Sequence, residues 1–235
     1  MIYKIVLLSA LYLASFVTKD AGVDQTVTAS VNTEVTFEME AKSVYEELHS
    51  TNLAKPQLAS FTKALKGFYE LKAAGVITKD MLTIVDFSMS SNKKRLWIID
   101  MSTKTILYNS LVAHGRNTGE EFAKNFSNAA ESYKSSLGFY VTGEVYNGKH
   151  GMSMKLDGLE KGINDNARNR AVVMHGADYV SDSFIKNHNR LGRSLGCPAI
   201  PVALTKKIIN TIKDRSCLFI YHPSGDRNKP ARHIS

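Results

Sequence analysis

Apolar residues recur at steps of three and four in the first third of the chain, which is the spacing of an amphipathic helix. A second, longer group of these positions follows Pro56, and Gly75 ends it, because glycine adopts the left-handed backbone that terminates many helices. The pattern predicts a helical element over residues 39–80 that packs its apolar face against the rest of the chain. The apolar positions are Val44, Tyr45 and Leu48, then Leu58, Phe61, Leu65, Phe68 and Leu71.

Beyond residue 81 the helical period gives way to short runs rich in β-branched and aromatic residues, separated by polar turns. The runs span residues 82–87, 95–100, 105–114, 138–145, 171–174 and 217–221. The first three follow one another closely and predict a β-meander. A further helix is predicted over residues 203–213. The expected fold class is therefore mainly β with an N-terminal helical element, and a polar tail over residues 224–235.

Two glycine-rich stretches interrupt the β pattern, at residues 146–162 and 190–198. Both are predicted to be long loops. Long loops inside a compact domain usually carry function, so these two stretches are the first places to look for a site.

The N-terminal segment has the pattern of an export signal. Lys4 precedes an uncharged apolar run, Ile5–Val17, which fits the hydrophobic region of a signal peptide and is too short for a membrane span. Residues 1–20 are expected to act as a signal peptide or an uncleaved anchor, which places the protein in the periplasm or cell envelope. Residues 21–38 show no helical stripe and are predicted to be a linker.

The composition is that of a globular protein, with 235 residues, 43% hydrophobic and 22% charged. It excludes collagen-like, disordered and polytopic membrane proteins. Thirty Lys+Arg against 22 Asp+Glu give a net charge of +8, which favours an anionic partner. Nucleic acid is not expected, because no basic stripe with interleaved aromatic residues is present. The histidines show no metal-ligand spacing, so neither a metal nor another cofactor is expected. The oligomeric state stays open.

The candidate chemistry lies at His175, which ends a predicted strand, and at Cys197, in the second glycine-rich stretch. Backbone N–H groups and the cation Arg193 near the cysteine favour a thiolate that reacts with electrophiles well below a pH of about 8.5. A nearby imidazole takes the thiol proton, as a cysteine nucleophile requires. These features fit equally a catalytic pair and a histidine with only a structural hydrogen bond. Cys217 is predicted to pack in the core, with a disulfide to Cys197 as the alternative; we expect Cys197 to be free.

A resemblance decides between these interpretations. The segment from Val172 to Pro201, VVMHGADYVSDSFIKNHNRLGRSLGCPAIP, resembles the catalytic segment of the YkuD-like L,D-transpeptidases, in which a histidine followed by glycine or serine precedes Ser/Thr-His-Gly-Cys. The flanking motifs FSN, SSLGFY, YNGKHG and LDGLEKGINDNARNR are similar to the murein L,D-transpeptidase branch. The likeness covers residues 82–222 and not the N-terminal helices. It implies a mixed β-sheet fold, sandwich-like or barrel-like, with the catalytic domain over residues 81–223.

The resemblance also implies roles for individual residues. Cys197 is the nucleophile, and His175 is its general base and later the acid for the leaving amine. The backbone N–H groups of Gly196 and Cys197 stabilise the oxyanion, and the backbone at Gly176 orients the imidazole. Ser194 matches the Ser/Thr of the motif. Tyr140, Asn128 and Tyr179 line the groove by resemblance, with core or turn positions as the alternative for each.

The chain departs from the family pattern in two ways. Leu195 stands where the wider family usually has a second histidine, and a leucine can neither donate to a substrate carboxylate nor share protons. The interval from His175 to Cys197 is longer than usual, and residues 178–192 are predicted to form a narrow loop over the site. The candidates for substrate contacts are Arg193, Ser194 and His114, of which Arg193 matches a carboxylate bidentately.

The implied reaction modifies peptidoglycan stem peptides. Cys197 attacks the carbonyl of the third, L-configured residue of a tetrapeptide stem, expels D-alanine and holds the stem as a thioester. An amine of a second stem then gives a 3→3 cross-link, whereas water makes the enzyme an L,D-carboxypeptidase. The alternative from another class is a non-catalytic wall-binding protein on the same fold, which Leu195 keeps open. A papain-like peptidase is disfavoured, because its cysteine precedes its histidine in the chain.

Overall fold

The computed structural model describes residues 25–226, with side chains from Val35 onward. The chain divides into two compact units, residues 1–36 and 37–235, and everything below from Phe37 on belongs to the second. The predicted signal peptide lies outside the described residues, as does most of the predicted polar tail. Within residues 25–226, no helix has both the length and the apolar character needed to cross a membrane.

Helix α1 covers Gln25–Glu47, so the prediction of a linker over residues 21–38 is wrong from Gln25 onward. Among the α1 residues from Val35 onward, whose side chains are described, Val35 and Met39 are exposed, and buried positions occur at Ala41 and Val44. A helix produces a periodic sequence pattern through the face that it buries. The helical period of the sequence accordingly becomes visible only near residue 41.

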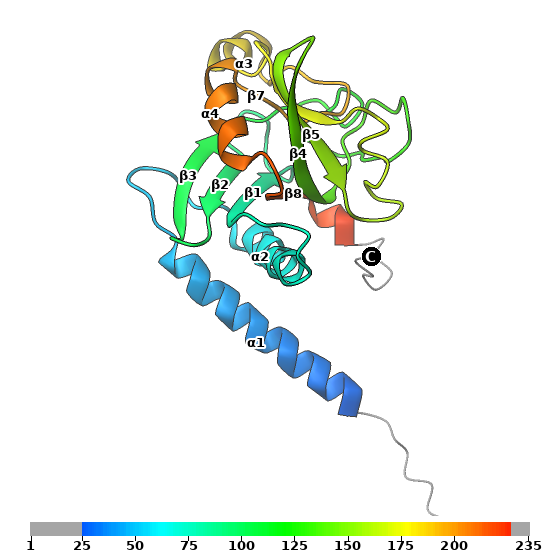
Figure 1. Ribbon diagram of the computed structural model, residues 1–235. Coiled ribbons are helices and arrows are strands. Elements are labelled where there is room, and N and C mark those ends of the chain that lie inside the picture. Colours follow the sequence, from blue (N-terminus) through cyan, green and yellow to red (C-terminus); the bar gives the residue numbers. More distant parts are fainter. Residues whose placement is uncertain (1–24, 227–235) are drawn as a thin grey trace, which may run out of the picture. The chain divides into compact units, whose positions relative to one another are not determined.

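Helix α2, Leu58–Ala73, packs on one face of the sheet against strands β1 and β8 (Figure 1). The predicted apolar stripe is buried at Phe61, Leu65, Phe68 and Leu71, whereas Leu58 in the first turn is exposed. Gly75, the predicted stop, has a φ of 68°, a left-handed conformation that glycine adopts without steric cost.

The remaining elements form one mixed sheet of eight strands in the order β3-β2-β1-β8-β4-β5-β6-β7. Strand β1 pairs in parallel with β8, and β6 with β7, and all other neighbours are antiparallel. The expected fold class, mainly β with N-terminal helices, is confirmed. The strands are β1 (Met81–Asp86), β2 (Leu96–Asp100), β3 (Thr105–Ser110), β4 (Gly138–Gly148), β5 (Gly151–Gly158), β6 (Val173–Gly176), β7 (Ala199–Ile200) and β8 (Cys217–Tyr221).

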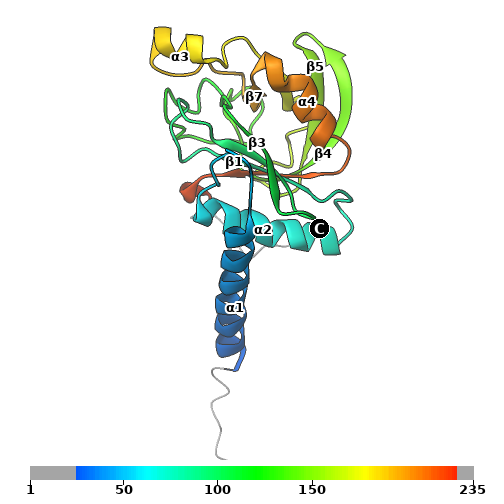
Figure 2. The same ribbon diagram turned by 90° about the vertical axis from the view of Figure 1, so that its left-hand side faces the viewer.

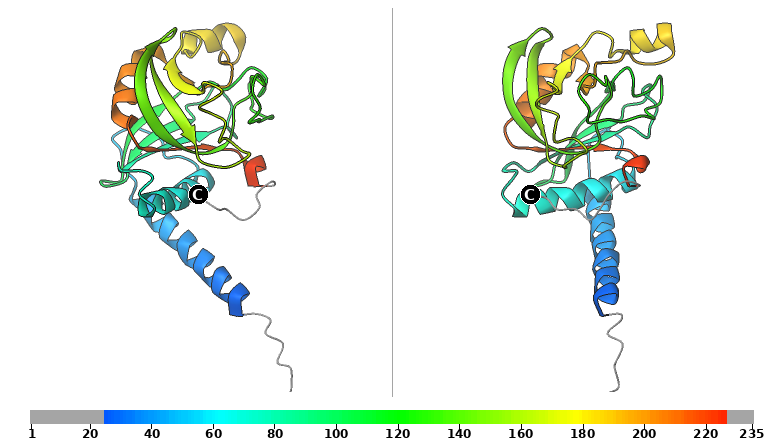
Figure 3. Two further views of the ribbon diagram at one scale, coloured as in Figure 1. Left: turned by 45° about the vertical axis from the view of Figure 1, so that its right-hand side comes forward. Right: turned by 90° about the vertical axis from the view of Figure 1, so that its right-hand side faces the viewer.

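The two edges of this sheet meet, which gives it a barrel-like form (Figure 3). Ala113, just beyond edge strand β3, forms an antiparallel bridge with Ala199 of the other edge strand, β7. Gly115 forms a second bridge with Ser194. The seam between the edges therefore runs along the glycine-rich loop before β7, where the candidate cysteine lies.

The central strands are buried on both faces, which explains why they are continuous apolar runs in the sequence. In β2, Leu96 and Ile98 face the core that contains α4, while Trp97 and Ile99 face the core under α2. Strand β8 alternates in the same way, and Cys217 is fully buried in the core under α2, as predicted. Both cysteines are free.

Three predictions of loops and helices have different outcomes. The predicted loop over residues 146–162 is wrong up to Gly158: β4 continues to Gly148, and β5 places Met154 and Leu156 in the core, an alternation that the flanking glycines hide in the sequence. Residues 159–162 do lie outside the strands. The stretch 190–198 is a loop, as predicted. Helix α4, Val202–Ile212, is also confirmed.

The segment 178–192 contains helix α3, Asp182–His188, where a narrow loop was predicted. Its N-cap Ser181 accepts a hydrogen bond from the N–H of Phe184, and Asn189 ends it with a left-handed backbone. None of its residues is buried, so it has no apolar stripe that the sequence could show. Helix α3 lies at the end of the domain away from α2 (Figure 2), and a short 3₁₀ helix, Pro223–Asp226, follows β8.

Candidate functional site

The loop that carries Cys197 lies alongside strand β6, which carries His175. The backbone N–H of Val173 donates a hydrogen bond to Sγ of Cys197 at 3.4 Å, and the carbonyl oxygen of Ala171 lies 3.8 Å from the same sulfur. His175 follows two residues further along β6 and pairs in parallel with Ala199 of β7. The structure therefore brings the predicted pair onto two adjacent segments of the sheet.

The hydrogen bond of the His175 ring determines its tautomer. Nδ1 lies 2.9 Å from the carbonyl oxygen of Gly176. A carbonyl only accepts, so Nδ1 carries the hydrogen and Nε2 keeps the lone pair that a general base needs. Burial lowers the pKa of His175, which keeps the ring neutral at pH 7. Gly176 thus lies where its predicted role requires, and a Cβ there would lie 2.3 Å from Oγ1 of Thr205 on α4.

The thiol of Cys197 is half-buried, and its environment differs from the predicted one. Burial raises its pKa, and the N–H of Val173 and the charge of Arg170 offset this only in part. The prediction that Arg193 favours a thiolate is wrong, because Arg193 is paired with Glu120. At rest the thiol and the imidazole are therefore both neutral, and the base must take the proton as the sulfur attacks.

The raised pKa of Cys197 predicts a particular pH profile for alkylation by iodoacetamide. The thiolate is the reactive species, so the rate should keep rising as the pH increases through and beyond 9. Catalysis needs a neutral His175, whose lowered pKa should preserve activity as the pH falls below the ordinary histidine value. Alkylation that is quenched at successive times and quantified by mass spectrometry checks the expected rise of the alkylation rate with pH. A rate that levels off below pH 8.5 would show a stabilised thiolate and contradict it.

Arg170 is the cation beside the cysteine, and the motif argument did not single it out. Its guanidinium donates to the carbonyl oxygens of Ser127 at 2.8 Å and Lys134 at 2.6 Å. One of its nitrogens would lie 3.4 Å from a Cβ placed on Gly196. The residue belongs to the LDGLEKGINDNARNR motif, so the resemblance contained the signal without indicating which basic residue mattered.

Ser194 and Gly196 shape the turn before the cysteine. The hydroxyl of Ser194 donates to the carbonyl oxygen of Cys197 at 2.6 Å and accepts from the N–H of Gly196 at 3.0 Å. The prediction that the N–H of Gly196 stabilises the oxyanion is therefore wrong, because that group is bonded within the loop. The N–H of Cys197 instead faces its own sulfur. Gly196 has a φ of 128°, and a Cβ there would lie 2.9 Å from the carbonyl oxygen of Lys134.

Replacing Ser194 by alanine should loosen this turn. Two hydrogen bonds are lost, and the buried N–H of Gly196 and the half-buried carbonyl of Cys197 are left without this partner, at a cost of about 1–3 kcal/mol in the free energy of unfolding. Activity should fall as well, since the carbonyl of Cys197 is no longer held. Denaturant unfolding and turnover assays of Ser194→Ala and Ser194→Thr make the comparison. Thr keeps the hydroxyl and should restore both properties, and equal behaviour of the two variants would refute the role.

His114 is buried and does not contact a substrate, contrary to its predicted role. Its Nδ1 lies 2.8 Å from Nη2 of Arg95, and its Nε2 lies 3.1 Å from the carbonyl oxygen of Gly119. Burial and the Arg95 charge lower the pKa of His114 to about 4. Its backbone nevertheless supports the site, because its carbonyl oxygen accepts from the N–H of Ser194 at 3.0 Å.

The other residues predicted to contact the substrate or line the groove differ in their exposure. Arg193 has little exposure and also donates to the carbonyl oxygens of Arg116 and Gly119, so its contact with a stem carboxylate stays a prediction. Leu195 is 60% exposed beside the cysteine, as a side chain that meets a ligand would be. Tyr140 is fully buried. Burial and the charge of Cys197 raise the pKa of Tyr179 to about 12, which indicates a position near the sulfur.

His150 is a site residue that the sequence analysis missed. It lies in the turn between β4 and β5, and its ring stacks on that of His175 with centroids 4.4 Å apart and planes inclined by 22°. His150 belongs to the YNGKHG motif, so the resemblance contained this residue without indicating a role for it, and the register of β5 and β6 places it over His175.

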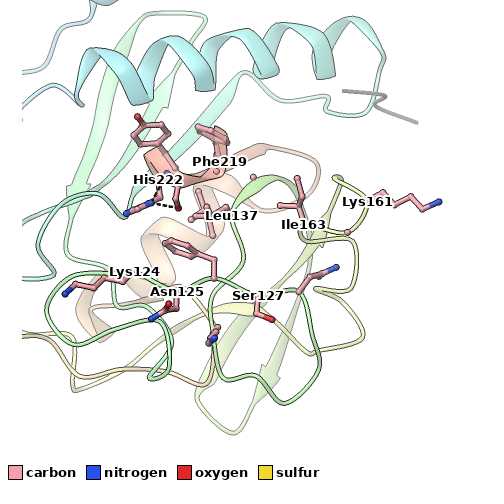
Figure 4. Close-up of a pocket in the computed structure, with 17 residues that line it drawn as sticks. Lys124, Asn125, Ser127, Leu137, Lys161, Ile163, Phe219 and His222 are labelled. Carbon is pink, nitrogen blue, oxygen red and sulfur yellow. Dashed lines mark hydrogen bonds between the residues drawn. The ribbon is translucent and has the colours of Figure 1, made fainter. Parts of the chain in front are cut away.

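A separate cavity of about 520 Å³ contains neither Cys197 nor His175 (Figure 4). Lys124 and Lys161 lie at its two ends, with Leu137 and Phe219 on one wall and Asn125 and Ser127 on the other. Among residues 25–226, no cluster of His, Cys, Asp or Glu side chains has the arrangement of a metal site.

Comparison with known proteins identifies one family. A family model described as the L,D-transpeptidase catalytic domain matches residues 53–221, which confirms the resemblance. The match includes α2, so the prediction that the likeness excludes both N-terminal helices is wrong for this helix. No curated protein matches the chain.

Solved structures similar to this chain include an L,D-transpeptidase from Mycobacterium smegmatis, with 8% identity and a TM-score of 0.38, over 61% of this chain and 59% of that one. An Enterococcus faecium L,D-transpeptidase mutant has 12% identity and a TM-score of 0.37, over 80% and 82%. One from Xylanimonas cellulosilytica has 13% identity and a TM-score of 0.36, over 77% of each chain. The chain spans about three fifths of the length of the first of these proteins.

Proposed function

Because this chain belongs to the L,D-transpeptidase catalytic-domain family, we propose that it is an exported cysteine L,D-transpeptidase that forms 3→3 cross-links in peptidoglycan. The observation that carries the proposal is the hydrogen bond from Nδ1 of His175 to Gly176, since it leaves Nε2 as a base beside the strand segment that holds Cys197. The apolar N-terminal run and the net charge of +8 support an anionic, extracytoplasmic polymer as the substrate.

In the first half-reaction, Nε2 of His175 takes the thiol proton as Sγ of Cys197 attacks the carbonyl carbon of the third stem residue. The oxyanion that forms accepts a hydrogen bond from the N–H of Cys197, the backbone donor that faces the sulfur. The imidazolium then returns the proton to the nitrogen of the departing D-alanine, and the C–N bond breaks. The product is a thioester between Cys197 and the shortened stem.

In the second half-reaction, an amine of another stem attacks the thioester carbonyl and gives its proton to His175. The C–S bond breaks, the thiol recovers the proton, and the two stems are joined through a new amide. Burial lowers the pKa of His175, so the ring is neutral and ready to accept a proton at each attack.

Chromatography of the products from a purified disaccharide-tetrapeptide tests this proposal. A cross-linked dimer with release of D-alanine is expected. A shortened monomer alone would show that water is the acceptor and that the enzyme is an L,D-carboxypeptidase. Substrate that is bound and recovered unchanged would contradict catalysis and favour a wall-binding protein. A Leu195→His variant that gains activity would then locate the cause at this departure from the family motif.

A further inference from the structure

The turn between β4 and β5 places an exposed imidazole directly over a buried one. Lys149 and His150 form this turn between Gly148 and Gly151, which pair with each other. The ring of His150 is exposed, whereas His175 beneath it is only 3% exposed. The rings lie nearly parallel, with centroids 4.4 Å apart. His150 takes no part in the proton transfers of the proposed reaction.

The stack is the contact that fixes the His150 ring, because no hydrogen bond of this ring is found within residues 25–226. Holding an exposed side chain in one orientation costs conformational entropy, and near-parallel aromatic contact offsets that cost. The stack in turn covers one face of the His175 ring.

The His175 ring needs a second constraint beyond its hydrogen bond. The bond from Nδ1 to the carbonyl oxygen of Gly176 fixes one point of the ring. That bond alone would allow the ring to pivot about this point, and a pivot would change the direction of Nε2. A group packed against the ring face blocks this motion. Small misplacements of a reacting group carry large rate costs, so such a constraint has functional value.

We propose that His150 is a positioning residue for the general base, holding the ring plane of His175 and with it the direction of Nε2, and keeping water off the face of the ring that it covers. The role of His175 as a base rests on the proposed function. The stack itself and its effect on the titration of His175 do not.

Besides packing on His175, the His150 side chain affects the pKa of His175. Burial lowers the pKa of His175 most strongly, and the charge of His150 lowers it further, while the hydrogen bond to Gly176 raises it. Helix α4, which packs on β6, presents Thr205 to Gly176, and its Lys206 and Lys207 are exposed. The loop before β7 contributes the thiol of Cys197, with Arg170 beside it. Strand β5 places Ser153 opposite His175.

Two substitutions separate the packing of the His150 ring on His175 from the effect of its charge. His150→Phe keeps a flat ring on His175 and removes the charge, whereas His150→Ala removes both. We expect kcat to fall roughly three- to thirtyfold in His150→Ala and to stay within about twofold in His150→Phe, with KM little changed in either. The pKa of His175, followed by ¹⁵N NMR of the imidazole nitrogens, should rise in both variants. His188→Ala is the matched control, since His188 is also exposed and stacks on Phe184; it should leave both quantities unchanged.

Equal kcat in wild type and both variants, with an unchanged titration of His175, would overturn the proposal. A change in KM alone would assign His150 to substrate contact and overturn it as well. Failure of the proposed function is distinguishable, because the titration of His175 and the alkylation rate of Cys197 are measured without substrate. Both would still respond to His150→Ala in a protein that catalyses nothing.

Discussion

Replacing Cys197 by alanine is expected to abolish thioester formation and D-alanine release, a loss of about 10,000-fold or more. The sulfur is the nucleophile that the N–H of Val173 holds against the strand of His175, and alanine leaves nothing at this position to form the covalent intermediate. Binding of the stem should survive, since the turn held by Ser194 and Gly196 bonds through the backbone of residue 197 and not through its side chain. Release of D-alanine, measured against time, gives the rate.

Cys217→Ala is the matched control for this loss. It also removes one thiol, but from the core under α2, where the side chain is fully buried. It should lower the free energy of unfolding by roughly 1 kcal/mol and leave turnover intact. Residual turnover in Cys197→Ala comparable to that of Cys217→Ala would place the nucleophile elsewhere.

The second large effect is expected from His175→Gln, with a loss of roughly 100- to 10,000-fold in kcat. Because burial raises the pKa of the Cys197 thiol, few thiolates form at neutral pH without a base. The remaining activity should therefore increase steadily with pH, up to and beyond 9, whereas the wild-type rate should be flat across the neutral range. His188→Gln, away from the base, should retain the wild-type profile. A flat profile for His175→Gln would mean that the histidine does not serve as the base.

The sequence predicts those elements whose burial follows a simple period. Strands β1, β2 and β8 are buried on both faces and appear as unbroken apolar runs, and α2 shows its stripe at Phe61 and Leu65. Residues 35–40 of α1 and all of α3 bury no stripe, so they carry no such pattern. Strand β5 does alternate, but the glycines at both of its ends give it the composition of a loop.

In the candidate site, the sequence predicts some residues but not the partners of their polar groups. Cys197, His175 and Gly176 follow from motif and strand position, and the structure places Cys197 against β6, the strand that carries His175 and Gly176. The partner of each polar group does not follow, because it depends on chain segments that are distant in sequence. His114 turns toward Arg95 and Arg193 toward Glu120, while Arg170 comes to the cysteine from another loop.

The positions of His150 and Gly196 have different causes, and neither follows from the sequence. The stack on His175 arises from the register of β5 on β6, which no local pattern encodes. The N–H of Gly196 is taken by Ser194 two residues away, a bond that depends on the exact turn conformation.

Intact-mass spectrometry of wild type and Cys197→Ala, each mixed with a defined disaccharide-tetrapeptide, tests the central claim most directly. The account predicts an adduct on wild type whose mass equals that of the substrate minus D-alanine. Peptide mapping should place it on the segment that contains Cys197, and Cys197→Ala should carry none. An unmodified wild-type protein that binds the substrate and releases no D-alanine, or an adduct of equal yield on Cys197→Ala, would contradict it.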